Sequence, residues 1–237
     1  MKLGIIGAME VEVEQLKEAM EVTSCIKRAS MEFYEGVLKG LPVVVVRCGI
    51  GKVNAALCTQ ILIDEFDIDA VINTGIAGSL NNDINIGDFV ISTKAVQHDY
   101  DIRPLGYKLG EIPGIASIGF KANEKLSNLV EKIAKDNIPE HAVFKGCVAS
   151  GDQFIADKAK KEAIVDTFDA LCCEMEGASI AQAASLNNVP FVVIRAISDK
   201  ADESEVVDYL TFEKEAAYNC ALLVSHVACE LAQDSQE

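Results

Sequence analysis

The sequence predicts a single α/β domain in which helices cover a largely parallel β-sheet. Short β-branched runs alternate along the chain with segments of helical period, which is typical of α/β layers. Several of these runs are continuously apolar, as strands covered on both faces should be. The chain has 237 residues, of which 50% are hydrophobic, and is long enough to bury a substantial core. Since no linker-like tract or internal repeat divides it, we expect one domain over residues 1–237.

The strands follow from apolar runs with β-branched residues. The segment Glu32–Leu38, followed by Gly40 and then Val43–Arg47, is typical of an antiparallel hairpin, so the sheet should be mixed. The predicted strands are Leu3–Ile6, Val43–Arg47, Ala70–Thr74, Phe89–Val96, Ala142–Ser150 and Phe191–Ile197.

The helices follow from apolar stripes of helical spacing, and the clearest runs through Leu126, Leu129, Val130 and Ile133. In such sheets ligands bind beyond the strand ends, so the candidate functional residues should follow the strands. The predicted helices are Val11–Met20, Val53–Phe66, Asn123–Asp136, Ala156–Phe168, Ala178–Leu186 and Phe212–Leu231.

Composition argues against several classes of protein. The net charge is −16, and the 21 Lys and Arg are scattered among 37 Asp and Glu, so we expect no nucleic-acid partner. The apolar N-terminal run stops at Glu10, which indicates a short buried strand rather than a signal peptide, and no segment is long enough to span a membrane. Eight cysteines without a CxxC pair suit reduced, buried thiols. We therefore expect a cytoplasmic protein.

Acidic residues follow the first strand at Glu10, Glu12 and Glu14. A solvated helix start explains acids at these alternate positions equally well, because the helix dipole favours negative charge there. Composition alone does not single out Glu12.

Two glycine-rich segments also follow strands. Arg47–Asn54 resembles a phosphate cradle, but it fails the Walker pattern at Val53 and the dinucleotide fingerprint at Asn54. Asn73–Gly78 is a second predicted glycine turn, which would let the backbone approach a ligand closely. Either turn is equally well explained by a structural role.

Aromatic and charged residues mark the ends of the later strands. Phe154 is able to stack on a flat ring or to pack in the core. Alternation places Arg195 and Asp199 on one side of the last strand, where a plain ion pair is the simpler interpretation. Glu174 and Glu176 share a side if the chain there is still extended.

Metal and serine-hydrolase chemistries lack support in the sequence. His98, His141 and His226 are dispersed, and neither HExxH nor GxSxG occurs, so we expect no metal site and no hydrolytic serine. What remains is a pocket of carboxylates, one arginine, glycine turns and an aromatic ring. Such a pocket suits acid–base cleavage of a neutral, hydroxyl-rich molecule.

Seven segments carry a resemblance to a known family. The segments GIIGAMEVE, CGIGKVNAA, NTGIAGSL, HDYDIRPLGY, SGDQFI, CEMEGASIA and VVIRAISDKA, in this order and spacing, resemble the 5′-methylthioadenosine/S-adenosylhomocysteine nucleosidases of the nucleoside phosphorylase superfamily. The resemblance implies a nucleoside phosphorylase-like fold, a central mixed, twisted sheet flanked by helices, and a homodimer. It also implies hydrolysis of the N-glycosidic bond to adenine and a thio-ribose, in methionine salvage and S-adenosylhomocysteine recycling, without metal or organic cofactor.

The resemblance gives catalytic roles to four residues. Glu12 would orient and deprotonate the attacking water, and Arg195 would steady that water and a neighbouring carboxylate. Asp199 would donate a proton to adenine N7, and Ser198 would help to hold Asp199.

The resemblance also implies a set of substrate contacts. Glu176 would accept hydrogen bonds from the ribose 2′- and 3′-hydroxyls, and Glu174 is a weaker candidate for the same contact. Met175 would pack on the sugar, Phe154 would stack on adenine, and Ile155 would bind its edge through backbone groups. Further contacts are implied for Met9, Ile50 and Phe212 and, from the partner subunit, for Ile102, Leu105 and Pro113.

Three features depart from the family's commonest pattern. Ile76 stands where the family often has serine, which leaves only backbone contacts there. Arg103 and the acidic insert Glu203–Asp208 leave the preference between a methylthio group and a homocysteine tail open.

Three alternatives stay open. A phosphorylase would use phosphate instead of water, although Glu12 on the nucleophile side would repel it. A nucleosidase for a related adenine nucleoside, such as aminodeoxyfutalosine, would share the motifs. A catalytically silent nucleoside-binding protein is less consistent with the joint presence of Glu12, Glu176, Arg195 and Asp199.

Overall fold

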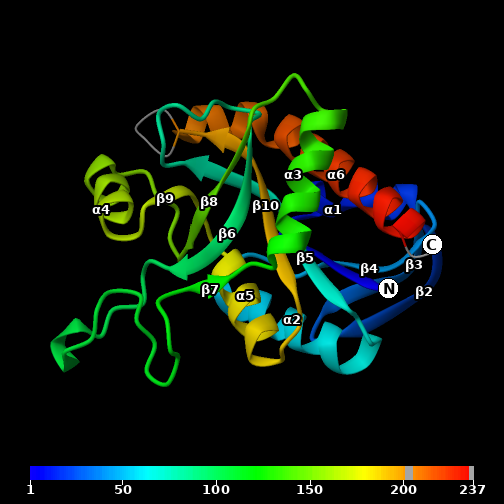
Figure 1. The fold of residues 1–237 in the computed structure, drawn as a ribbon, viewed down its shortest axis with the longest axis horizontal. Helices are drawn as coiled ribbons and strands as arrows, with labels where there is room; N and C mark the ends of the chain where they lie inside the picture. Colours follow the sequence, from blue (N-terminus) through cyan, green and yellow to red (C-terminus); the bar gives the residue numbers. More distant parts are fainter. Residues whose placement is uncertain (201–204, 235–237) are drawn as a thin grey trace.

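A mixed β-sheet forms the centre of the molecule (Figure 1). The computed structural model describes residues 1–200 and 205–234, and the side chains of these residues except 205–210. Within this part of the chain the sheet has ten strands. They are β1 (Leu3–Gly7), β2 (Glu21–Arg28), β3 (Met31–Leu38), β4 (Leu41–Arg47), β5 (Ala70–Ser79), β6 (Phe89–Gln97), β7 (Phe120–Lys121), β8 (Val143–Ser150), β9 (Ala170–Glu174) and β10 (Phe191–Asp199).

Part of the sheet closes on itself. The strand order is β10-β6-β8-β9-β5-β1-β4-β3-β2, and β10 also pairs with β5, so β5, β10, β6, β8 and β9 form a ring. The β1–β4, β1–β5, β5–β10, β6–β8 and β8–β9 pairs are parallel, whereas β10–β6, β5–β9 and the β2–β3–β4 ladders are antiparallel. The predicted hairpin and the mixed sheet are therefore confirmed. The ends of β5, β8, β9 and β10 meet around one region.

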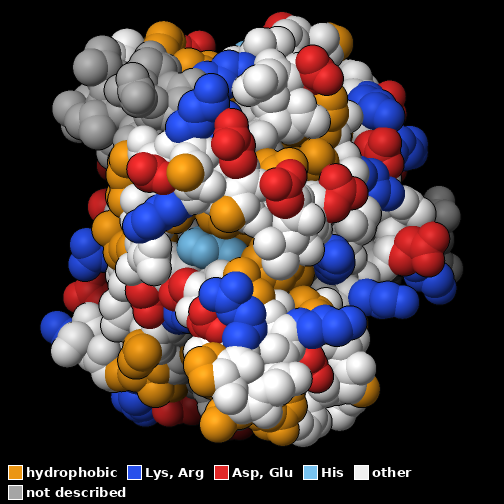
Figure 2. Space-filling view, turned by 90° about the vertical axis from the view of Figure 1, so that its left-hand side faces the viewer, with side chains coloured by type: hydrophobic (Ala, Val, Ile, Leu, Met, Phe, Trp, Pro, Cys, Tyr) orange, Lys and Arg blue, Asp and Glu red, His pale blue; other side chains and the backbone are white. Residues whose placement is uncertain are grey.

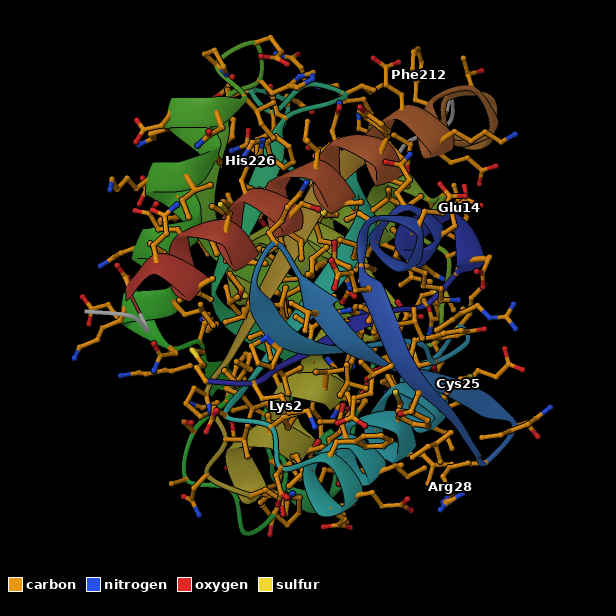
Figure 3. All side chains as sticks on the ribbon, turned by 90° about the vertical axis from the view of Figure 1, so that its right-hand side faces the viewer. Lys2, Glu14, Cys25, Arg28, Phe212 and His226 are labelled. Carbon is orange, nitrogen blue, oxygen red and sulfur yellow. The ribbon has the colours of Figure 1, made fainter. Side chains whose placement is uncertain are left out.

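Two layers of helices cover the sheet (Figures 1 and 3). The helices are α1 (Glu10–Ala19), α2 (Lys52–Phe66), α3 (Glu124–Asn137), α4 (Lys158–Phe168), α5 (Gly177–Leu186) and α6 (Glu205–Asp234), with a short 3₁₀ turn at Arg103–Leu105. Apolar residues of α1, α3 and α6 share one buried cluster with the sheet, and those of α2 and α5 share another. The predicted α/β fold class is confirmed.

Several boundaries differ from the predictions. β2 was not predicted, because most of its side chains are exposed and it lacks an apolar run. The glycine turn predicted at Asn73–Gly78 is wrong, since these residues lie inside β5 and are fully buried. Helix α6 is longer than the predicted Phe212–Leu231. None of the helices in the described part of the chain is both long and apolar enough to cross a bilayer.

The cysteines are free thiols, as predicted. Six of the eight are buried, whereas Cys25 is exposed on β2 and Cys229 is half-buried on α6. Burial raises the pKa of the Cys58 and Cys172 thiols well above its usual value, which makes them unreactive core residues.

Candidate active site

A cavity of about 300 Å³ opens where the carboxyl ends of several strands meet. Carboxylates from three separate segments, Glu12, Glu176 and Asp199, line this one space. The other lining residues are Ala8, Met9, Ile50, Ile76, Ala77, Gly78, Gln153, Phe154, Ile155, Cys173, Glu174, Met175 and Ser198. Among the described residues the lining contains no Lys or Arg.

Glu12 is fixed in the first turn of α1. Its Oε2 accepts hydrogen bonds from the backbone N–H groups of Ala8 (2.7 Å) and Met9 (2.8 Å), and its Oε1 accepts one from Ile76 (3.1 Å). Burial raises the pKa of Glu12, while the nearby Arg195 and these N–H groups work to lower it. By contrast, Glu10 and Glu14 are exposed, as expected for a solvated helix start. Burial is the property that distinguishes Glu12.

The backbone of β5 makes room for the Glu12 side chain. A Cβ at Gly75 would lie 2.4 Å from Glu12 Oε1. Glycine is therefore required at position 75 inside the strand, because the Glu12 carboxylate occupies the space where a side chain of residue 75 would lie.

Arg195 lies on β10 and is almost completely buried. Its guanidinium pairs with the Glu174 carboxylate, and its Nη2 also donates to Asn73 Oδ1 at 2.5 Å. Burial opposes its charge, but Glu174, Glu12 and Glu176 together raise the pKa of Arg195, so the guanidinium stays charged. The ion pair of Arg195 thus forms with Glu174 rather than with Asp199. Strict alternation also ends at a bulge between Ile197 and Asp199.

The two acids that follow β9 have different environments. β9 ends at Glu174, and Glu176 caps α5 with φ −131° and ψ −41°, so the chain is no longer extended as the shared-side argument required. Glu174 accepts hydrogen bonds from Ser150 Oγ and from the N–H groups of Glu176 (3.1 Å) and Gly177 (2.8 Å), in addition to Arg195. Its oxygens are therefore held by the protein.

Glu176 faces the cavity with fewer protein contacts. Its Oε1 accepts a hydrogen bond from the N–H of Gly51 at 2.7 Å. Burial, and then the adjacent Glu174 carboxylate, raise the pKa of Glu176. A carboxyl group retains acceptor capacity for hydrogen bonds from hydroxyl groups in either protonation state.

The opposite end of the cavity carries an acid and an aromatic ring. Ser198 Oγ donates to Asp199 Oδ1 at 2.7 Å, and Asp199 is 3% exposed. Phe154 is 51% exposed beside the cavity, whereas Ile155 is buried.

Five predicted site residues do not line the cavity of this single chain. They are the buried Arg195, Phe212 on α6 (Figure 3), Ile102, the exposed Leu105 and the exposed Pro113. The side chains of the predicted insert Glu203–Asp208 lie outside the described residues. Five residues line the cavity without having been predicted, because only their place beside predicted residues marks them: Ala8, Ala77, Gly78, Gln153 and Cys173.

Charges of both signs are interspersed on the face that carries α4, with hydrophobic side chains between them (Figure 2).

Within residues 1–200 and 205–234, no group of three or more His, Cys, Asp and Glu is placed to hold a metal ion.

Comparisons with known proteins agree on one family. The model of the phosphorylase superfamily matches residues 2–228. A 5′-methylthioadenosine/S-adenosylhomocysteine nucleosidase of Bacillus cereus is 41% identical over 98% of this chain and 100% of its own. The Neisseria meningitidis nucleosidase, solved with methylthio-immucillin-A, superposes with a TM-score of 0.93 at 38% identity, covering 97% of this chain and 99% of its own. A futalosine hydrolase of Helicobacter pylori gives 0.91 at 35% identity, with 97% of each chain covered.

The raised pKa of Glu176 makes stability depend on pH. A folded-state pKa above the unfolded value of 4.5 favours folding at low pH, and this contribution is lost as pH rises through the folded value. We expect Glu176→Gln to gain stability relative to the unchanged protein between about pH 5 and about pH 8. Urea unfolding at several pH values measures this difference.

The exposed Glu14→Gln is the matched control and should leave the pH profile unchanged. A relative loss of stability by Glu176→Gln as pH rises would show that the native state favours the ionised carboxylate.

Proposed function

The chain belongs to the 5′-methylthioadenosine/S-adenosylhomocysteine nucleosidases of the phosphorylase superfamily, and we propose that its cavity hydrolyses the N-glycosidic bond of these two adenine nucleosides. The products would be adenine and a thio-substituted ribose, in methionine salvage and S-adenosylhomocysteine recycling. The observation that carries the mechanism is the convergence of Glu12, Glu176 and Asp199 on one cavity.

The base would bind between Phe154 and Asp199. Phe154 stacks on adenine, and backbone groups of the buried Ile155 bind the purine edge. Asp199 donates a proton to N7, which turns adenine into a better leaving group. The hydrogen bond from Ser198 orients the acid for this transfer.

The sugar would bind on the glutamate side. Glu176 accepts hydrogen bonds from the 2′- and 3′-hydroxyls, and Met175 packs against the ring. Departure of the base leaves positive charge on the ribose, and nearby carboxylates stabilise such an oxocarbenium-like state.

Glu12 would activate the water. Three backbone N–H groups fix its carboxylate, and burial raises its pKa, which makes it a stronger base. Arg195 does not line the cavity, and it would steady the neighbouring acids through its charge rather than contact the water. Since protein donors surround the oxygens of Glu174, we assign it the role of holding Arg195 rather than the sugar.

Water is favoured over phosphate as the nucleophile. A phosphate on the sugar side would meet Glu12 and Glu176, and like charges repel strongly where water is excluded. Arg195, the nearest cation, is already paired with Glu174.

A related adenine nucleoside, such as aminodeoxyfutalosine, is a second candidate substrate. The Helicobacter pylori futalosine hydrolase has nearly the same fold similarity as the nucleosidase structure from Neisseria meningitidis. Apolar Met9, Ile50 and Ile76 line the cavity and impose no charge requirement on the substituent. Substrate profiling separates these candidates.

We also propose a homodimer that completes the site. Ile50, Val53 and Leu57 are exposed at the start of α2, and Leu186 of α5 is exposed in the same groove as Val53. Exposed apolar residues gathered in this way mark an interaction surface. In the dimer, Ile102, Leu105 and Pro113 of a second copy would reach the thio end of the substrate, beside Ile50 and Phe212.

The first prediction concerns the reaction itself. Purified protein mixed with 5′-methylthioadenosine in phosphate-free buffer should release adenine, as measured by absorbance and chromatography. Added phosphate should neither accelerate release nor yield a sugar phosphate. Phosphate-dependent release would identify a phosphorylase instead.

Asp199→Asn should retain nucleoside binding but lose turnover by about 10²–10⁴-fold, the usual contribution of acid–base catalysis. Calorimetric titration with 5′-methylthioadenosine and adenine-release kinetics measure the two properties separately. The exposed Asp83→Asn serves as the control and should behave normally. Near-normal turnover of Asp199→Asn would contradict its role as the acid.

The dimer makes a prediction for sedimentation. The unchanged protein should sediment at twice the chain mass, and Val53→Glu should sediment as a monomer with reduced activity, because a charge is then placed in the apolar contact. Val22→Glu, at an exposed position on β2, is the control. Sedimentation of the unchanged protein as a monomer would refute the dimer.

A further inference from the structure

Three loops around the cavity are joined by a group of polar residues that the proposed mechanism does not use. Lys52 begins α2, Asp99 follows β6, and Asp152 follows β8. We call these three residues the clasp. We propose that Asp99 is a positioning residue that, through the clasp, holds the segment bearing Phe154 in place for base stacking; this proposal rests on the proposed function.

Asp99 links two of the loops directly. Its Oδ1 accepts a hydrogen bond from Lys52 Nζ at 2.6 Å, and its Oδ2 accepts one from the N–H of Asp152 at 2.9 Å. The two charged side chains are only 18% and 12% exposed, for Lys52 and Asp99 respectively. Shielding of this degree makes the pair stronger than a typical surface ion pair.

The third link closes a ring of contacts. The backbone N–H of Lys52 donates to Asp152 Oδ1 at 2.8 Å. Asp152 is thus fixed by both its N–H and its carboxylate, two residues before Phe154. Gly51 has a φ of +99°, and a Cβ there would lie 3.1 Å from Asp152 Oδ1.

The same ring connects the base side to the sugar side. The N–H of Gly51 donates to Glu176, while the next N–H along the chain, that of Lys52, donates to Asp152. Both groups lie at the positive end of α2, which favours bound carboxylates. Residues 51–52 therefore set the spacing between the sugar-binding acid and the Phe154 segment.

The Phe154 segment needs such anchors. Residues 151–157 belong to no helix or strand, and Phe154 is half exposed, so the position of this segment depends on individual contacts. On the other side, Gly151 packs on the His98 ring, and a Cβ at Gly151 would lie 2.4 Å from His98 Nε2. Consecutive residues His98 and Asp99 thus hold Gly151 and Asp152. A preorganised segment binds its ligand with a smaller loss of entropy.

Asp99 remains ionised in this setting. Burial works to raise the pKa of Asp99, but Lys52 and the N–H of Asp152 outweigh burial and hold it below its usual value. Neither Asp99 nor Lys52 lines the cavity. Asp99 therefore acts through the Phe154 segment and not on the substrate.

The absence of tryptophan from the sequence allows a direct test. Phe154→Trp places a single fluorescent reporter at the stacking position, and titration with adenine should quench it. Adding Asp99→Asn should weaken adenine binding about tenfold. In the chain with Phe154 intact, Asp99→Asn should raise KM for 5′-methylthioadenosine about tenfold while kcat changes less than about threefold, because ground-state binding is what is lost.

A matched control removes an ion pair elsewhere. Glu131→Gln breaks the contact with Lys135 within α3 and the contact with Lys145 of β8, and it should leave both KM and quenching unchanged. Partial unfolding would lower the apparent kcat without raising KM, so the KM effect separates positioning from a general structural role. If Asp99→Asn does not fold, Lys52→Gln tests the same clasp.

The outcomes also separate this inference from the proposed function. Unchanged KM and unchanged quenching, or a fall in kcat alone, would overturn the role of Asp99 even though the enzyme is active. A reporter that adenine does not quench, together with no adenine release, would instead refute the proposed function.

Discussion

The site depends on one buried guanidinium surrounded by carboxylates. Arg195 remains charged at 2% exposure because Glu174 pairs with it, and a buried charge without a partner costs several kcal/mol. Glu174 in turn accepts hydrogen bonds from the N–H groups of Glu176 and Gly177, so the Glu174–Arg195 pair also fixes the start of α5. Because Glu176 is the N-terminal cap residue of α5, the position of its carboxyl group depends on this ion pair.

The acidic residues around Arg195 outnumber it, and this excess determines the electrostatics of the cavity. Burial raises the pKa of both Glu12 and Glu176, so each carboxylate is more basic than it would be in water. In the absence of substrate this arrangement is unfavourable to folding at high pH. In the mechanism that we propose, the same carboxylates would stabilise the positive charge that develops on a bound sugar, so the site would favour the transition state over the ground state.

The sequence predicted the strands and helices that have a local pattern of apolar residues. It missed features that depend on residues far away in the chain. The apolar strands β1, β4, β5, β6, β8 and β10 were found by their runs of Val and Ile. β9 was missed because it has only five residues, ALCCE, and carries no β-branched residue. The glycines of Asn73–Gly78 predict a turn, because the residue that requires Gly75 inside a strand, Glu12, lies 63 positions earlier in the chain. No local sequence pattern predicts that β10 pairs with β5.

The segment Arg47–Asn54 shows how a rejected motif can still be informative. Its glycine pattern resembled a phosphate cradle and failed the established fingerprints. In the structure the N–H groups of Gly51 and Lys52 do donate hydrogen bonds, but the acceptors are the protein's own carboxyl groups, those of Glu176 and Asp152. Because this loop binds carboxyl groups of the protein itself, it does not need the phosphate-binding residues that the established fingerprints require. The sequence contained the donor half of the site, and only the fold could show that the acceptors come from residues 100 and 125 positions away.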